Sequence, residues 1–423
     1  MVAYITPVYT YPTVTSGTWG VIVGAESTAA GGQTYSGSGY LQLDYGLLGT
    51  DKLAPSGTIL NLLPQTDVRS VDIRRGRSRD DQVFDVGTMT IVLDNRSGQY
   101  DPDKSDGIYQ RKVDSGTTVS YFAPGLYGEL VFSTGSGAAS LNTAFTGYLE
   151  TAVADHGIDP TVTLTFVDAL AVAGRANMNN AALTFPKGES TSTRVQRILD
   201  GAGILSLASA KSINGNRLVA ELVAQDTSAL DLIEQVMVDE AARVYVSRGG
   251  VFTVKTHTNV AAGSSVLTLT DAAVSGAVEY NAIETLPAHA QLINRVVLKH
   301  ADGRQWSRTE QTSAARYGVM GVELSTNLLA TTDINALMTF AAARRAYPST
   351  AIASVTAELR GLSAATVATV IAADLTSKMT VNRTTVDGRT LTPTVWVEGI
   401  NATITPDSWT WQFQTSPIDT DSY

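Results

Sequence analysis

The chain has 423 residues, of which 43% are hydrophobic and 17% charged, and its formal net charge is −10. A chain of this length exceeds one ordinary hydrophobic core and is expected to form about three domains. Its hydrophobic content excludes wholesale disorder, and its negative charge disfavours a protein that grips DNA through phosphate contacts. Cysteine is absent, which excludes disulfides and thiolate metal sites.

Residues 1–65 are predicted to form a β-rich arm or strand extension. Charges are sparse there, the first being Glu26, and residues 18–23 and 40–45 predict two strands with glycine-rich turns between them. An arm that docks on a neighbouring subunit is one interpretation; an additional strand pair is simpler and is favoured. The start lacks the basic and apolar regions of a signal peptide, and no apolar run approaches the ~18 residues of a membrane span.

Residues 66–176 are predicted to form a β-barrel-like domain. Residues 71–74 and 89–94 alternate apolar with mostly polar side chains, as half-buried strands do. Asp94-Asn95-Arg96-Ser97-Gly98 then has the Asx and glycine chemistry of a tight turn. Further short strands, as in a small barrel or sandwich, are expected at residues 117–122, 129–132, 144–150 and 161–167.

Residues 177–290 are predicted to form an α+β domain. Residues 192–200 have one apolar helical face, and Gly201 follows where a C′ glycine is expected. Ser228 and Asp231 resemble a capping box at the start of a second amphipathic helix. Gly249-Gly250, flanked by two short apolar runs, predicts a hairpin after that helix.

Residues 291–423 are predicted to form a second β-barrel-like domain with inserted helices. Asp333 is expected to cap one helix, and Asp387-Gly388 to turn a hairpin. Near the C-terminus, Trp409, Trp411 and Phe413 alternate along one strand face. This aromatic stripe could bind a sugar or a partner, but its strand spacing favours a place in the core.

Two acidic groups are candidate functional sites. Asp94, Asp101, Asp103 and Asp106 superficially suggest calcium, but their spacing fails the EF-hand pattern, so a solvated turn is favoured. Asp239 and Glu240 are neighbours on a helix, where side chains point about 100° apart. They are therefore expected to form a polar helix end rather than a catalytic carboxylate pair.

The densest basic cluster consists of Arg74, Arg75, Arg77 and Arg79, next to Asp80 and Asp81. The adjacent acids favour an ion-paired or intersubunit surface over nucleic-acid binding.

The four histidines, His156, His257, His289 and His300, lack metal-binding spacing. The sequence contains no nucleophile elbow and no phosphate-binding glycine loop. We therefore predict no catalytic, cofactor-binding or metal-binding residues.

Three stretches together resemble a known family. They are R-G-R-S followed by V-G-T-M-T-I-V-L-D-N-R-S-G-Q-Y-D-P near the first barrel strands, F-T-G-Y-L-E followed by T-L-T-F-V-D-A-L, and V-E-G-I with I-T-P-D-S-W-T near the end. The chain resembles the minor tail proteins, or tail-hub proteins, of long-tailed actinobacterial siphophages. The resemblance covers residues from about 60 to 417.

The resemblance implies a mainly β, multi-domain fold with two β-barrel-like domains and attached α+β domains. It also implies a homotrimeric ring at the tail tip of a virion assembled in the bacterial cytoplasm. The expected partners are other copies of the chain, the distal tail or tail-tube protein, the tape-measure protein, and other minor tail and receptor-binding proteins. Such a ring would let DNA pass without binding it specifically. The alternatives are a receptor- or carbohydrate-binding protein and, less favoured, a cell-wall glycan hydrolase with two carboxylates in a cleft.

Overall fold

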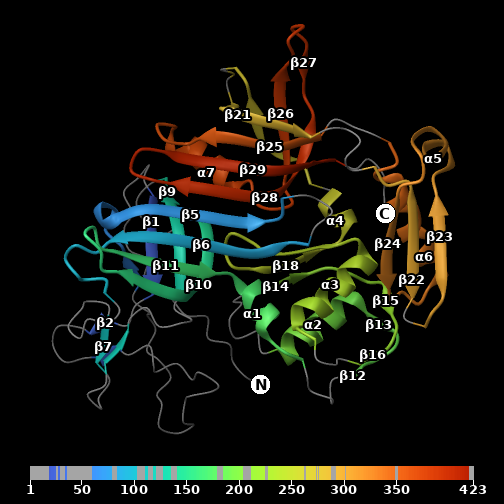
Figure 1. Ribbon diagram of the computed structural model, residues 1–423, viewed down its shortest axis with the longest axis horizontal. Coiled ribbons are helices and arrows are strands. Elements are labelled where there is room, and N and C mark those ends of the chain that lie inside the picture. Colours follow the sequence, from blue (N-terminus) through green and yellow to red (C-terminus); the bar gives the residue numbers. More distant parts are fainter. Residues whose placement is uncertain are drawn as a thin grey trace.

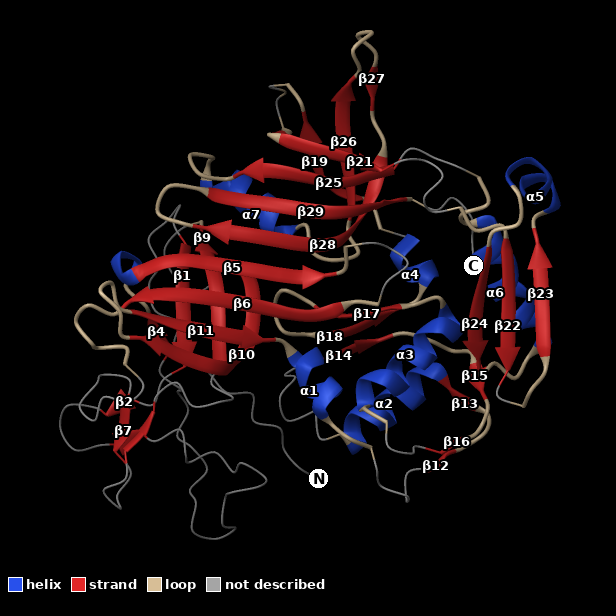
Figure 2. Ribbon diagram, viewed as in Figure 1, coloured by secondary structure: helices blue, strands red, loops and turns tan. Residues whose placement is uncertain are grey.

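The computed structural model shows a mainly β, multi-domain chain, which confirms the predicted fold class (Figures 1 and 2). The residues that the structure describes are 19–24, 27–28, 34–35, 60–78, 83–101, 110–112, 118–120, 127–134, 141–178, 184–202, 211–223, 227–261, 263–272, 274, 276–286, 292–300, 302–347 and 351–418.

A 15-stranded sheet forms the body of the molecule, and its strands come from two separate parts of the chain. The amino-proximal strands are β1 (Trp19–Gly24), β4 (Leu60–Leu62), β5 (Val68–Gly76), β6 (Asp85–Asp94), β9 (Tyr127–Ser133), β10 (Leu141–Asp155) and β11 (Thr161–Val167). The carboxy-proximal strands are β19 (Ser265–Thr270), β20 (Val278–Glu279), β21 (Ala282–Leu286), β25 (Ala351–Glu358), β26 (Lys378–Thr384), β27 (Thr390–Leu391), β28 (Thr394–Ile404) and β29 (Trp409–Pro417).

The two groups of strands join where β5 pairs antiparallel with β28, from Val71↔Ile404 to Gly76↔Gly399. The sheet curls, so that β1 and β9 cross behind β5 and β6 (Figure 2). One hydrophobic cluster fills the inside of the curl and takes side chains from both groups. Alternation explains this: Val71, Ile73, Met89 and Ile91 are all buried, while their polar neighbours point outward.

An α+β unit follows the amino-proximal strands and has a hydrophobic cluster of its own. Its helices are α1 (Ala169–Arg175), α2 (Thr191–Gly201), α3 (Ala229–Glu240) and α4 (His257–Ala261). Its strands are β12 (Thr184–Phe185), β13 (Glu189–Ser190), β14 (Lys211–Ile213), β15 (Leu218–Val219), β16 (Leu222–Val223), β17 (Arg243–Val246) and β18 (Phe252–Lys255).

Local predictions for this unit are confirmed with one exception. Ser228 and Asp231 form the capping box of α3, and β17 and β18 form the hairpin, with Gly250 at a φ of 79°. Gly201, by contrast, lies inside the last turn of α2, and Ala202 is the C-cap. The helix therefore ends one residue later than expected, without a left-handed glycine.

A third cluster lies beneath a small sheet at one side of the molecule. Here β22 (Arg295–His300) pairs with β23 (Gln305–Thr309) and with β24 (Gly321–Thr326), and α5 (Gln311–Tyr317) and α6 (Thr331–Ala343) accompany them. The expectation that Asp333 caps a helix is wrong. The N-cap of α6 is Ala330, without a side-chain cap bond, so Asp333 lies inside the first turn.

The remaining short elements are β2 (Ser27–Thr28), β3 (Thr34–Tyr35), β7 (Gln110–Lys112), β8 (Thr118–Ser120), the 3₁₀ turn η2 (Gln65–Asp67) and α7 (Ala364–Ala372). The strand expected at 40–45 lies outside the described residues. None of the helices in the described part of the chain combines the length and hydropathy that crossing a bilayer requires. The four domain ranges predicted from the sequence stay a prediction.

We expect Ser228→Ala to lower the free energy of unfolding by about 1 kcal/mol, because the Ser228 side chain accepts the Asp231 amide N–H at the start of α3. Urea unfolding followed by circular dichroism measures the change. Ser325→Ala, an exposed strand residue, is the matched control and should leave stability within about 0.5 kcal/mol.

Candidate functional site

Two irregular points in the large sheet lie next to each other where it meets the α+β unit. The pairing of β28 with β29 skips Glu398 between Val397 and Gly399, so Glu398 is the extra residue of a β-bulge. The pairing of β5 with β6 also shifts, between Arg74 and Gly76. Bulges re-aim side chains. Here they aim charged side chains into the protein, and we call the resulting cluster of Arg75, Arg77, Arg243, Asp374 and Glu398 the junction.

Glu398 is the centre of the junction and is fully buried. One of its carboxylate oxygens accepts hydrogen bonds from Arg77 Nε at 2.8 Å and Arg77 Nη2 at 2.7 Å. The other accepts from Arg243 Nη2 at 2.8 Å and from Ser416 Oγ at 2.6 Å. A buried carboxylate is tolerated only when its charge and its lone pairs are both matched. Two arginines and a hydroxyl meet that condition here.

The two arginines also pack against aromatic rings. The Arg77 guanidinium lies 4.5 Å from the centroid of the Phe84 ring, and the Arg243 guanidinium lies 5.2 Å from that of Trp396. Planar guanidinium groups stack on such rings while they still donate hydrogen bonds at their edges. The rings therefore hold both donors in the orientation that Glu398 needs.

Arg75 links the junction to the β17–β18 hairpin. Its Nη1 donates to Asp374 Oδ1 at 2.8 Å, and its Nη2 donates to the carbonyl oxygen of Val246 at 2.7 Å. The other oxygen of Asp374 accepts the backbone N–H of Arg248 at 2.9 Å. Arg75 and Asp374 thus attach the hairpin of the α+β unit to both strand groups of the sheet.

Gly76 and Gly399 let the two backbones approach. They are directly paired, and Gly76 has a φ of 87°. A Cβ atom at Gly76 would lie 2.3 Å from the Glu398 carbonyl oxygen, and one at Gly399 would lie 2.5 Å from the Arg77 carbonyl oxygen. Only glycine fits either position. Two of the signature stretches, R-G-R-S and V-E-G-I, therefore meet in space although they lie far apart in sequence.

Asp168 is a further buried carboxylate where the sheet passes into α1. Its oxygens accept the backbone N–H groups of Leu170 and Gly87, each at 2.9 Å. Burial raises the pKa of Asp168 to about 7, against the opposing effect of these two hydrogen bonds and of the nearby Arg75 charge. The group is therefore a cap and a link between β6 and α1, and it titrates near neutral pH.

Asp239 and Glu240 are the last two residues of α3, as expected, but both side chains are buried. Asp239 Oδ1 accepts Thr326 Oγ1–H at 2.6 Å and the Asn327 N–H at 3.0 Å. Glu240 accepts the Thr191 hydroxyl and the N–H groups of two consecutive loop residues, 216 and 217. Burial raises the pKa of Asp239 to about 6. The pair joins α3 to the start of α2 and to the end of β24.

Two arginines of the predicted ion-paired or intersubunit surface are ion-paired, but inside the chain and with partners far away in sequence. Arg75 and Arg77 pair with Asp374 and Glu398 inside the chain. Arg74 is exposed. Arg79, Asp80 and Asp81 lie outside the described residues.

The acidic loop is a hydrogen-bonded turn over the part that the structure describes. Asp94 Oδ1 accepts the Arg96 N–H at 3.0 Å, and Asn95 Oδ1 accepts the Tyr100 N–H at 3.0 Å. Asp94 also pairs with Arg69 at 3.2 Å. Asp101 is half-buried, whereas Asp103 and Asp106 lie outside the described residues. Within the described chain, no three acidic or histidine side chains cluster closely enough to hold a metal ion.

The histidines are dispersed. His156 is exposed, with Nδ1 3.7 Å from Asp101. His257 is buried against Phe340, and His300 is buried with Nδ1 2.8 Å from Asp302. His289 lies outside the described residues.

The aromatic stripe is core, as favoured. Trp411 and Phe413 are buried, and Trp409 is half-buried against the edge of the Phe132 ring, with the two centroids 6.0 Å apart. The carbohydrate-binding alternative required exposed aromatic side chains, and these aromatic side chains are not exposed.

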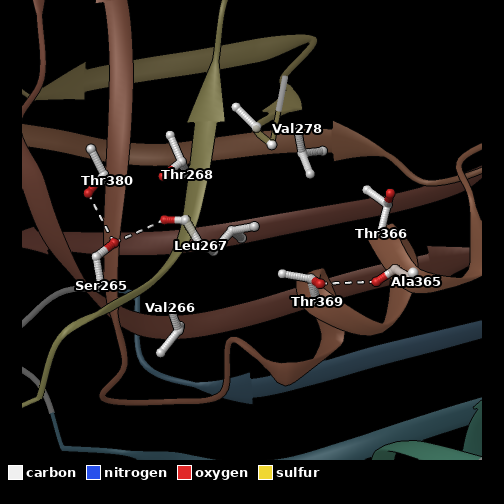
Figure 3. Close-up of a pocket in the computed structure, with 11 residues that line it drawn as sticks. Ser265, Val266, Leu267, Thr268, Val278, Ala365, Thr366, Thr369 and Thr380 are labelled. Carbon is white, nitrogen blue, oxygen red and sulfur yellow. Dashed lines mark hydrogen bonds between the residues drawn. The ribbon is translucent and has the colours of Figure 1, made fainter. Parts of the chain in front are cut away.

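A groove lies between β19, β20 and α7, and Figure 3 shows its lining. Every residue that lines it is uncharged, and its hydroxyls bond within the chain: Thr380 to Ser265, and Thr369 to the Ala365 carbonyl oxygen. Among the residues that the structure describes, the lining of this groove therefore contains no acid, base or activated nucleophile.

The junction has the properties of a structural joint. Each of its carboxylates is occupied by arginine or backbone donors, so none is placed to transfer a proton to a bound molecule. Reasoning from sequence missed Glu398, Asp374 and Arg243 as partners. For Glu398, the sequence contained one signal of a buried charge: an acid inside the otherwise apolar strand V-W-V-E-G-I.

Solved structures with this fold exist. The chain is similar to the 43 kDa tail protein of prophage MuSo2 from Shewanella oneidensis, with a TM-score of 0.56, 10% identity, and coverage of 95% of this chain and 98% of that one. It is also similar to a tail protein from Neisseria meningitidis MC58, with a TM-score of 0.55, 10% identity, and coverage of 94% and 96%. At this identity the likeness establishes a shared fold. No protein-family model matches the chain, and no curated protein sequence is significantly similar to it.

We expect Glu398→Gln to lower the free energy of unfolding by about 3–5 kcal/mol, because it leaves the buried guanidinium groups of Arg77 and Arg243 without their counter-charge. Urea unfolding measures the loss. Glu323→Gln removes one partner of the exposed Lys299–Glu323 pair and should cost less than about 1 kcal/mol. Equal losses in the two variants would contradict the central role of Glu398.

Asp168 should make the protein more stable as the pH falls. Its folded pKa of about 7 lies above its unfolded value, so between about pH 4 and pH 7 the folded state binds the extra proton. The contribution to the free energy of unfolding should rise by about 1.4 kcal/mol per pH unit on acidification. Asp168→Asn should remove this contribution in urea titrations, most clearly between pH 6 and 7, because Asp239, whose pKa is raised to about 6, adds a slope of the same sign below that range. The exposed Asp200→Asn should retain the slope.

Proposed function

We propose that the chain is a structural component of a bacteriophage tail. The observation that carries the proposal is the shared fold over nearly the full length of two proteins that are named as tail proteins, one of them from a Mu-like prophage. The junction agrees with a structural role, because its buried charges hold the units of the chain together and none is free for chemistry. The proposed role is thus architectural rather than enzymatic.

Within the tail, we infer that the chain is a hub or minor tail protein at the tip. The resemblance of its signature stretches to siphophage hub proteins supports this inference. The curled sheet, filled by its own core, supplies a packed wall segment for a ring. Three copies would close a ring that ends the tail tube, and DNA would pass through its centre. The ring would contact the tube or distal tail protein, the tape-measure protein and receptor-binding proteins.

The two strand groups give a physical reason for threefold symmetry. Each chain contributes two sets of sheet strands that meet at the β5–β28 pair. Three chains therefore present six strand groups around one axis, which would match a hexameric tube. The junction would keep the angle between the two groups constant, as a closed ring requires.

The purified full chain, of 44.7 kDa, should form closed rings of three copies. Sedimentation equilibrium gives the mass, and electron microscopy gives the symmetry. Glu398→Gln should reduce ring formation, because the angle between the strand groups loses its restraint, while Glu323→Gln should not. A chain that remains monomeric, or that releases sugars from cell-wall material, contradicts the proposal.

A further inference from the structure

The small sheet of β22–β24 carries a basic and apolar surface at the end where α5 lies. Val319 and Met320, which precede β24, are 58% and 48% exposed, and Tyr347, after α6, is 52% exposed. Arg295, Arg308 and Arg316 are exposed around the same end. We call these six residues the basic end. Arginine, tyrosine and methionine are enriched in protein interfaces, and charged lysine and glutamate are depleted.

The basic end is held rigid by one fully buried residue, Asn294. Its side chain donates to the Gly318 carbonyl oxygen at 2.7 Å and to Ser313 Oγ at 3.2 Å, and it accepts the Met320 N–H at 2.8 Å. Ser313 in turn donates to the carbonyl oxygen of Ala346, the residue before Tyr347. The exposed side chains are therefore presented on an ordered framework, which lowers the entropy that binding would cost.

Charge distinguishes this part of the chain. Residues 292–347 contain seven Arg or Lys and four Asp or Glu, a formal charge of +3 in a chain of −10. Arg295, Arg308 and Arg316 form no ion pair within the described residues; Arg316 stacks near Tyr317, with 5.2 Å from the guanidinium carbon to the ring centroid. Exposed arginines without carboxylate partners, around an apolar centre, fit an acidic partner surface.

A complementary surface lies on the turn between β10 and β11. Residues 150–161 contain three acids and no Arg or Lys. Glu150 pairs with Arg175, and Asp159 pairs with Arg69 and Arg96, so Asp155 is the acid of this turn whose charge stays unpaired among the described residues. Ile158 at the tip is fully exposed, and Val153 beside it is 60% exposed. Asp155 is exposed and accepts only the Gly157 N–H among the described residues. This turn, which we call the acidic hairpin, therefore presents exposed apolar side chains beside one unpaired carboxylate, the opposite charge to the arginines of the basic end.

The two surfaces lie on opposite sides of the chain. Thr161 at the start of β11 pairs with Asp94 at the end of β6, so the acidic hairpin lies at that end of β6. In Figure 1 this end of β6 is on the left and α5 is on the far right. A contact between two different patches on opposite sides repeats head to tail, which closes a ring when the rotation allows it.

We propose that the basic end of one chain docks on the acidic hairpin of a second copy. Val319 and Met320 pack against Ile158, and Arg316 and its neighbours pair with Asp155. This proposal rests on the ring proposed above and names the surfaces that make it. The same contact cannot form within one chain, because the two patches lie on opposite sides of it (Figure 1).

Charge reversal on the full-length chain tests the contact, with ring mass measured by sedimentation at low and high salt. Arg316→Glu should weaken ring assembly at least tenfold, and so should Asp155→Arg. The chain that carries both reversals should assemble like the wild type, because each contact again joins opposite charges. Lys187→Glu, an exposed turn residue on the α+β unit, is the matched control and should assemble normally.

Every other outcome contradicts at least one of the two proposals, the docking contact or the ring. If the wild type forms rings and Arg316→Glu forms them equally well, the docking proposal is wrong and the ring proposal stands; the basic end then serves a different tail protein. If the single reversals weaken assembly but the double reversal does not restore it, the acidic hairpin is not the partner. A wild-type chain that stays monomeric overturns both proposals. Unchanged circular dichroism in every variant excludes misfolding as the cause.

Discussion

A single buried carboxylate, that of Glu398, is the constraint on which the arrangement of this protein depends. An ion taken out of water is tolerated only when opposite charge and hydrogen-bond donors replace the water completely. The donors are Arg77, directly after β5, Arg243 in β17 and Ser416 in β29, so both strand groups of the sheet and the α+β unit must be in place together. A displaced region would leave charge unmatched in the interior. The junction therefore specifies one relative position of these regions more than it adds net stability.

The β-bulge makes this possible. In a regular strand, side chains alternate between the two faces, and a glutamate between Val397 and Gly399 would follow that alternation. The skipped register puts one extra residue at Glu398, and the six residues 395–400 are all buried. Gly76 and Gly399 allow the close backbone approach beside it. The β-bulge, the two glycines and the buried ion pairs therefore depend on one another.

The α+β unit is attached at both of its ends by buried carboxylates. Asp168 joins it to β6, and Asp239 joins it to the end of β24 in the small sheet that carries the basic end. A rigid chain of this kind is suited to assembly, because the position of a docking surface on one side is transmitted to the strand groups on the other. Separate domains on flexible linkers would not fix the angles that a closed ring needs.

The sequence by itself determined the elements whose causes are local. Alternation located β5, β6 and β11, the Ser228–Asp231 pair marked the start of α3, and Gly250 marked its hairpin. The aromatic stripe at Trp411 and Phe413 was likewise assigned correctly to the core. Only the tertiary structure decided that Arg77 pairs with Glu398 and that Asp239 and Glu240 are buried. It also decided that 15 strands from two separate parts of the chain form one sheet. The reason is physical: an exposed and a buried acid have the same local pattern, and burial depends on partners that lie tens to hundreds of residues away.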